Sequence, residues 1–152
     1  MEILITDSGY GHSVAAARDL KASGHGVHVV GGKFSPASMS RVVSVSHGLN
    51  ASDSRADQIL KICRDNRLDG VIPVGIESVF ALNSIRGELA GETGYALPPI
   101  SALEVSKDKF RLQNYAGELG IPAPSSKLVT TFDELEFQIA SATVPFVLKS
   151  VS

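Results

Sequence analysis

Short apolar runs alternate with segments of helical period along the first hundred residues, and this alternation constrains the fold more than any other feature. The runs predict strands at 3–6, 27–30, 42–45 and 71–74. The helical segments cover 12–22, 53–66 and 77–91, with Ser52 or Asp53 as the cap of the second. Strands that alternate with helices form a parallel sheet with helices on both faces. The sequence therefore predicts a Rossmann-like α/β domain over residues 1–100.

The stretch "YALPPIS" ends this alternation, since two adjacent prolines are incompatible with the interior of a helix. Beyond it, we expect a helix over 107–119 that stops at "GIPAPSS", where Gly120 is suited to a C-terminal cap. A strand at 127–129, a helix at 132–140 and a strand at 146–149 should follow. Thr131 and Glu134 have the spacing of a capping box. Residues 101–152 thus read as a smaller α+β unit.

Composition excludes several classes of protein. The formal charge of −2 over 152 residues gives no basic field, so no nucleic-acid partner is expected. No apolar stretch approaches the ~20 residues needed to cross a bilayer, and "MEILITDSGYGH" reads as a first strand rather than a signal peptide. The single cysteine, Cys63, forms no internal disulfide and fits a reducing compartment. We expect a cytoplasmic protein that does not contact membranes.

Ligands of open parallel sheets bind at the carboxyl ends of the strands. The loops there are "DSGYGH", "GGKF", "SHGLN" and "VGIES". Two glycines in the first loop let backbone amides approach a ligand at a helix N-terminus, although any fold of this type needs a tight turn there. The candidate substrate-binding residues are Asp7, Ser8, Gly9, Tyr10, Gly11, His12, Glu77 and Ser78.

The first loop is not a dinucleotide fingerprint. Gly9 and Gly11 match G-x-G, but Val14 occupies the third glycine position, and "VVGGKF" carries no acid after the second strand. Ser8 does not fit the G-x-S-x-G pattern of serine hydrolases. The sequence therefore favours neither an NAD enzyme nor a serine hydrolase, and it identifies no catalytic residue.

The histidines are scattered and have no metal-ligand spacing, so no metal site is predicted. His25 and His28 are interpreted as structural or solvated. His12 and His47 keep a functional alternative, because both lie on the ligand edge. Glu77 either stabilises the positive end of the following helix or faces the crevice and holds an amine.

A longer pattern runs through "SKDKFRLQNYAGELGIPAPSSKLVTTFDELEFQIASATVPFVLKS". An Asp-Lys pair opens a helix, a "GIP-P" break and a capped helix follow, and a hydrophobic run ends in lysine. This segment resembles the start of the ATP-grasp fold of carboxylate–amine ligases, biotin carboxylase and the carbamoyl-phosphate synthetase large subunit. "LDGVIPVGIES" and the layout of residues 1–100 are similar to the Rossmann-like domain that precedes it. Ser150 departs from the proline that many members have after the lysine.

The resemblance implies that Lys109 and Lys149 hold the phosphates of ATP. It further implies an ATP- and Mg²⁺-dependent ligase that converts a carboxylate into an acyl phosphate and joins it to an amine. The glycine-rich loop, the adenine-binding linker and the Mg²⁺ ligands are expected beyond Ser152. The chain is then an N-terminal fragment, inactive alone, that needs the remainder of the ATP-grasp domain in the same or a partner chain. Nothing in the sequence names the carboxylate, the amine or the oligomeric state.

Two alternatives remain open at this point. "ILITDSGYGHSVAAARDLKASGHGVHVVGG" is similar to the opening of GT-B glycosyltransferases, in which His12 would serve as the acceptor-side base. The chain is otherwise a non-catalytic Rossmann module that senses a small molecule.

Overall fold

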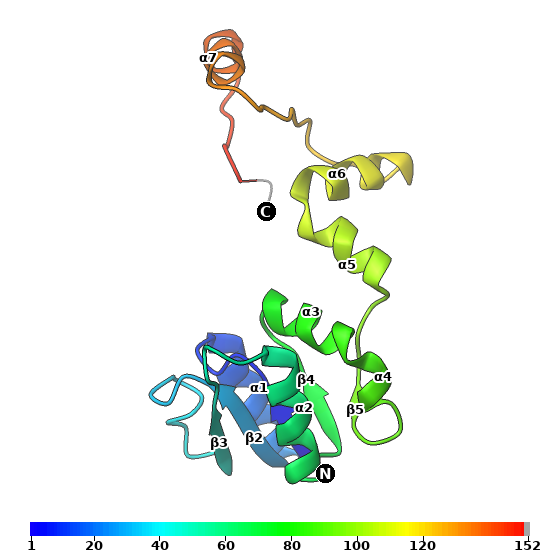
Figure 1. Ribbon diagram of the computed structural model, residues 1–152. Coiled ribbons are helices and arrows are strands. Elements are labelled where there is room, and N and C mark those ends of the chain that lie inside the picture. The colour runs from blue at the N-terminus through cyan, green and yellow to red at the C-terminus, as the bar shows by residue number, and fades with distance from the viewer. Residues whose placement is uncertain (151–152) are drawn as a thin grey trace. The chain divides into compact units, whose positions relative to one another are not determined.

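The computed structural model describes residues 1–150. The chain forms two compact units, Met1–Leu97 and Pro98–Ser152, and each is described by itself (Figure 1).

A five-stranded parallel sheet forms the centre of the first unit, in the order β3-β2-β1-β4-β5. Its strands are β1 Glu2–Ile5, β2 Gly26–Gly31, β3 Val45–Gly48, β4 Gly70–Ile72 and β5 Gly94–Tyr95. Leu4 of β1 pairs with His28 on one side and with Val71 on the other. The chain builds the sheet outward from β1 to β3, then crosses back to add β4 and β5 on the other side. This Rossmann-like arrangement confirms the predicted fold class.

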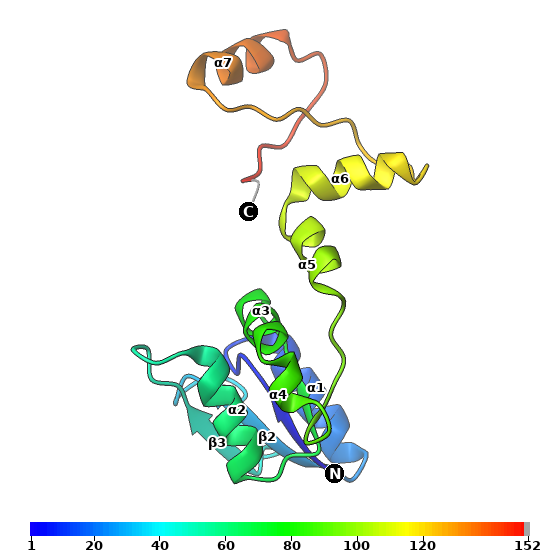
Figure 2. The ribbon, with the colours of Figure 1, turned by 45° about the vertical axis from the view of Figure 1, so that its right-hand side comes forward.

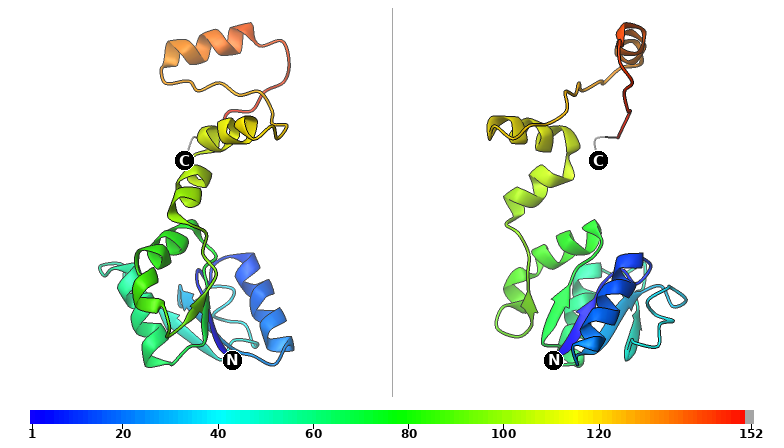
Figure 3. Two further views of the ribbon diagram at one scale, coloured as in Figure 1. Left: turned by 90° about the vertical axis from the view of Figure 1, so that its right-hand side faces the viewer. Right: turned by 180° about the vertical axis from the view of Figure 1, so that it is seen from behind.

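Helices cover both faces of the sheet. They are α1 Gly11–Ala22, α2 Arg55–Asp65, α3 Ile76–Ser84 and the short α4 Arg86–Leu89. One buried cluster joins Leu4 and Val30 to side chains of α2 and α3, and another joins Val27 and Val29 to Ala17 of α1. Helix α2 lies on the near side of the sheet in Figures 1 and 2, and α1 is in front when the molecule is seen from behind in Figure 3 (right). Each large side chain buried in this way contributes about 1.5–3 kcal/mol.

Several boundaries in the first unit differ from the sequence-based expectation. Strand β3 covers 45–48 rather than 42–45, because Val42 and Val43 pack against the α1-side cluster from a turn and pairing with β2 begins at Val45. Ser54, not Ser52 or Asp53, caps α2 and accepts a hydrogen bond from the Asp57 amide.

The predicted helix over 77–91 is also divided in the structure. Ile85, with φ −108° and ψ 18°, separates α3 from α4. The two-residue strand β5 has too few residues to give a sequence pattern, and it was not predicted.

The second unit contains α5 Ile100–Lys107, α6 Lys109–Glu118 and α7 Phe132–Ser141. The single helix expected over 107–119 is wrong at its start, because Asp108 leaves the helical conformation between α5 and α6. Its carboxylate accepts the Phe110 and Arg111 amides, each at 2.9 Å, and so caps α6. The capping box of α7 is confirmed, since Thr131 and Glu134 satisfy each other's backbone amides.

The strands expected at 127–129 and 146–149 do not form among the described residues. Both stretches are extended, and the hydrophobic side chains Leu128, Phe146 and Leu148 lie exposed. A strand is stable only when another strand pairs with it, and these stretches have no ladder. None of the helices described for residues 1–150 has the length and apolar character to span a membrane.

Candidate functional site

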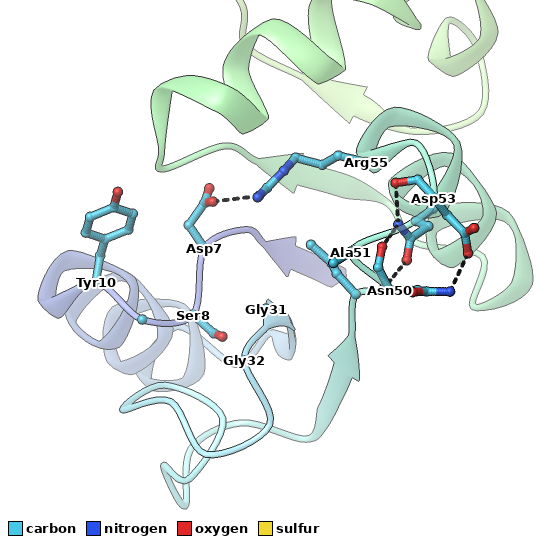
Figure 4. A pocket seen from close by; sticks show the side chains of 12 residues that line it. Asp7, Ser8, Tyr10, Gly31, Gly32, Asn50, Ala51, Asp53 and Arg55 are labelled. Carbon is cyan, nitrogen blue, oxygen red and sulfur yellow. Dashed lines mark hydrogen bonds and ion pairs between the residues drawn. The ribbon is translucent and has the colours of Figure 1, made fainter.

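The carboxyl ends of β1, β2 and β3 border a cavity of about 500 Å³ in the first unit (Figure 4). The lining residues are Asp7, Ser8, Gly9, Tyr10, Gly31, Gly32, Leu49, Asn50, Ala51, Asp53, Arg55 and Gln58. They come from the loop after each of the three strands and from the first turn of α2. This is the edge at which parallel α/β sheets bind ligands.

Asp7 follows β1 and has the left-handed φ of 55°, which aspartate tolerates better than most residues. Its Oδ2 accepts hydrogen bonds from the Gly75 amide at 2.8 Å and from the Thr6 hydroxyl, and Arg55 Nη1 lies 3.0 Å from its Oδ1. Burial alone would raise the pKa of this carboxyl. The hydrogen bonds from Thr6, Gly75 and Ser78 and the charge of Arg55 outweigh burial and hold the pKa below its ordinary value. Asp7 is therefore an anion at neutral pH.

Two glycines make room for these contacts. A Cβ on Gly75 would lie 2.9 Å from the Asp7 carboxyl carbon, and one on Gly31 would lie 3.0 Å from the Ser8 amide nitrogen. A side chain at Gly75 would press on the Asp7 carboxyl group, and one at Gly31 would press on Ser8.

Arg55, the first residue of α2, links three elements. Its Nη1 contacts Asp7 Oδ1 at 3.0 Å and donates to Ser78 Oγ at 3.1 Å, and its Nη2 contacts Glu77 Oε2 at 3.1 Å. Asp7 and Arg55 point toward one another in Figure 4. The Asp7 side chain is 10% exposed, so this pair is worth more than the pair with Glu77, which is 78% exposed.

Ser8 is fully buried and holds the loop after β2 to the end of β1. Its hydroxyl accepts from Ser35 Oγ at 2.6 Å, and its carbonyl accepts from the Ala37 amide at 3.0 Å. These contacts give Ser8 a structural role in addition to its place on the wall of the cavity.

The structure brings together half of the predicted substrate-binding residues. Asp7, Ser8, Gly9 and Tyr10 line the cavity. Glu77 and Ser78 do not line the cavity, but both accept hydrogen bonds from Arg55, which does. Gly11 and His12 begin α1 and are not among the lining residues. His12 is exposed and stacks on Tyr10, with 5.4 Å between the ring centroids, which gives no support to its role as an acceptor-side base.

Sequence reasoning missed Arg55, Asp53 and Gln58. The predicted strand at 42–45 ended three residues too early, so the N-terminus of α2 was not counted as part of the ligand edge. In the structure Asn50 Nδ2 donates to Asp53 Oδ2 at 2.9 Å, and Gln58 Oε1 accepts from the Asn50 amide at 2.7 Å, which fixes this loop against α2.

Lys109 and Lys149 belong to the second unit. Lys109 is the exposed first residue of α6, and Lys149 is exposed in the extended segment after α7. Their assignment to ATP phosphates stays a prediction. Within residues 1–150, no three His, Cys, Asp or Glu side chains are grouped so that they could hold a metal ion.

Comparison with known proteins finds similar sequences and folds within longer chains. No family model matches the chain. The carbamoyl phosphate synthase large chain of Methanoregula boonei is 25% identical over 137 residues, which cover 88% of this chain and 13% of that protein. Glycinamide-RNase-transformylase T from Mycobacterium tuberculosis superposes with a TM-score of 0.67 at 23% identity, over 95% of this chain and 40% of its own.

The biotin carboxylase domain of Hydrogenobacter thermophilus 2-oxoglutarate carboxylase, solved with MgADP, ADP and bicarbonate, gives a TM-score of 0.64 at 14% identity. The alignment covers 95% of this chain and 33% of that domain. The chain thus spans less than half the length of each of these proteins. These likenesses show that the chain has the fold of the matched part of these proteins.

Proposed function

We propose that this chain supplies the N-terminal part of an ATP-dependent ligase of the ATP-grasp type. In that reaction a carboxylate oxygen attacks the γ-phosphorus of ATP, which releases ADP and forms an acyl phosphate. An amine nitrogen or similar nucleophile then attacks the acyl carbon, and phosphate leaves. The relationship to the carbamoyl phosphate synthase large chain and to the biotin carboxylase fold supports this reaction class.

The observation that carries the proposal is the cavity at the carboxyl edge of the sheet. Its wall holds the ionised Asp7, the amide of Asn50 and the carboxylate of Asp53. These groups offer hydrogen-bond acceptors to a small substrate, and Arg55 fixes the orientation of Asp7. We assign this cavity to a small-molecule substrate of the ligase.

ATP supplies the phosphoryl group, and this chain contributes Lys109 and Lys149 to hold it. Both ammonium groups are exposed, and a lysine ammonium is a mobile point charge that suits phosphate oxygens. In phosphoryl transfer the protein mainly positions the groups and neutralises their charge. Residues 1–150 bring no metal-binding group together, so the proposal assigns them no Mg²⁺ ligand.

The test is a turnover assay on the protein that carries this chain together with the rest of its ATP-grasp domain. We expect ADP and phosphate to form in the presence of Mg²⁺ only when both a carboxylate and an amine are supplied from defined panels. ADP formation that no carboxylate in the panel stimulates would contradict the proposal.

A binding role without catalysis is the alternative, and one observation favours it. Every residue that lines the cavity belongs to Met1–Leu97, so the first unit by itself forms a wall suited to a small molecule. A protein of that kind would bind a small molecule with an affinity that ATP and Mg²⁺ leave unchanged.

A further inference from the structure

Two histidines on neighbouring strands contact one another in the first unit. His28 Nδ1 of β2 lies 3.0 Å from His47 Nε2 of β3, and the rings stack with 5.2 Å between their centroids. His28 pairs with Val45 and Val30 pairs with His47, so the two histidines are diagonal neighbours on the same face of the sheet. Glu2 of β1 places Oε2 3.4 Å from the other ring nitrogen of His28. The three side chains form a row across β1, β2 and β3.

The number of protons on this row decides whether the central contact holds. A 3.0 Å contact between two ring nitrogens is a hydrogen bond only when one nitrogen carries a proton and the other does not. One positive charge is compatible with it, because a protonated His28 donates to both Glu2 and a neutral His47. With both rings protonated, two N–H groups face each other and the hydrogen bond is lost.

The surroundings make the second proton unfavourable. The His28 side chain is only 8% exposed, and Glu2 and His47 are the titratable groups within ion-pair or hydrogen-bond distance of it in residues 1–150. Burial, followed by the charge of His28, lowers the pKa of His47. Both effects act against a doubly charged pair.

Strand β3 connects this contact to the cavity. Within residues 1–150 it lies at the edge of the sheet and pairs with β2 alone, through the register that runs from Val45 to Gly48. The residues directly after Gly48 form one wall of the cavity, namely Leu49, Asn50, Ala51 and Asp53. An edge strand that loses a partly buried cross-strand contact opens more readily than the central strands do.

We propose that the Glu2–His28–His47 row is a pH-sensitive contact that keeps β3 paired and thereby holds the β3–α2 wall of the cavity in place. Acquisition of a second proton by the two imidazoles loosens β3 and the 49–53 segment, while β1 and β4 stay paired. This device depends on the sheet alone, so it holds whichever ligand the cavity binds and whether or not the ligase reaction is correct.

The experiment is amide hydrogen exchange and imidazole NMR titration on the 152-residue chain between pH 8 and pH 5. Protection factors, which correct for the intrinsic pH dependence of exchange, are compared between strands. We expect protection of the 45–48 amides to fall by about twofold to tenfold relative to the β1 amides, the factor that the loss of one hydrogen bond gives. The 49–53 resonances should shift with the same midpoint.

His47→Gln keeps a side chain that accepts from His28 but cannot gain a proton, so it should abolish the pH dependence of β3. His25→Gln, in the turn before β2, is the matched control and should leave that dependence intact. Two outcomes overturn the proposal: equal loss of β3 protection in wild type and His47→Gln, or independent titration of both imidazoles at their ordinary pKa with β3 unchanged. The second outcome is read on the wild-type chain, so the test does not depend on the folding of any variant.

Discussion

Leu4, Ile59 and Leu82 of the first unit are fully buried, whereas Phe137, Phe146 and Leu148 of the second unit are more than half exposed. Both regions have hydrophobic residues at the spacing of strands and helices. Among residues 1–150, only the first unit contains a strand ladder on which helices can pack, and Leu103 is the one buried residue of the second. A hydrophobic pattern therefore specifies the apolar face of one helix or strand. A core forms only where a second element covers that face.

The largest expected effect on this contrast comes from truncating a buried side chain in the first unit. Leu82→Ala removes a fully buried side chain from the α2/α3 cluster, so we expect a loss of about 2–5 kcal/mol in the free energy of unfolding. Leu148→Ala makes the same chemical change at an exposed position and should stay within about 0.5 kcal/mol. Denaturant unfolding measures both. Similar losses for the two variants would show that the second unit buries this surface in solution.

The second prediction tests the assignment of Lys149, in the second unit, to the phosphates of ATP. In the protein that carries the rest of the ATP-grasp domain, Lys149→Ala should weaken ATP binding by about tenfold to a hundredfold, as expected when a hydrogen bond to a charged group is lost. Lys127→Ala is the matched control, because this exposed lysine contacts Gln138 and belongs to the same unit. Calorimetric titration with ATP measures both affinities. Unchanged affinity in Lys149→Ala would count heavily against the assignment.

The third prediction tests the electrostatics of the cavity. Arg55→Ala leaves the partly buried Asp7 without its ion pair, so the pKa of Asp7 should rise and the protein should lose about 1–3 kcal/mol at neutral pH. In the wild type the pKa of Asp7 is lower in the folded than in the unfolded state. Its contribution to stability is therefore present above the unfolded value of 3.8 and lost as pH falls below it.

As the pH falls below this value, the Arg55→Ala variant should lose less free energy of unfolding than the wild type. Carboxyl carbon NMR titration follows Asp7, and Arg41→Ala, at an exposed arginine, is the control. An Asp7 pKa that is the same in Arg55→Ala and in wild type would show that the hydrogen bonds from Thr6, Gly75 and Ser78 suffice to keep this carboxyl ionised.

The smallest effect is the pH dependence of global stability near neutrality. The pKa of His47 is lower in the folded state, so its contribution is present above the unfolded value of 6.5 and is lost as pH falls below that value. The change should be small, since His47 lies on a partly exposed edge strand. Urea midpoints at pH 7.5 and pH 5.5 measure it, and identical slopes for wild type and His47→Gln would exclude His47 as the cause.

Much of the first unit could be predicted because its signals are local. The alternation of apolar runs with helical segments was sufficient for the parallel sheet, and the loops at its carboxyl edge contain Asp7, Gly31 and Asn50, which line the cavity. The capping box at Thr131 is equally local and formed as predicted. The strand boundaries were less certain, because Val42 and Val43 satisfy a hydrophobic pattern from a turn as well as from a strand.

The sequence by itself determined the fold class and the resemblance to ATP-grasp proteins, and it predicted the edge of the sheet that carries the cavity. Each of these depends on residue type and spacing along the chain. Only the tertiary structure decided that Arg55 meets Asp7, 48 residues away, and that His28 meets His47 across two strands. The strand order β3-β2-β1-β4-β5 and the packing of α2 on the sheet bring these residues together. The extended segments of the second unit also depend on tertiary structure. A strand needs a partner strand, and its own residues do not specify that partner.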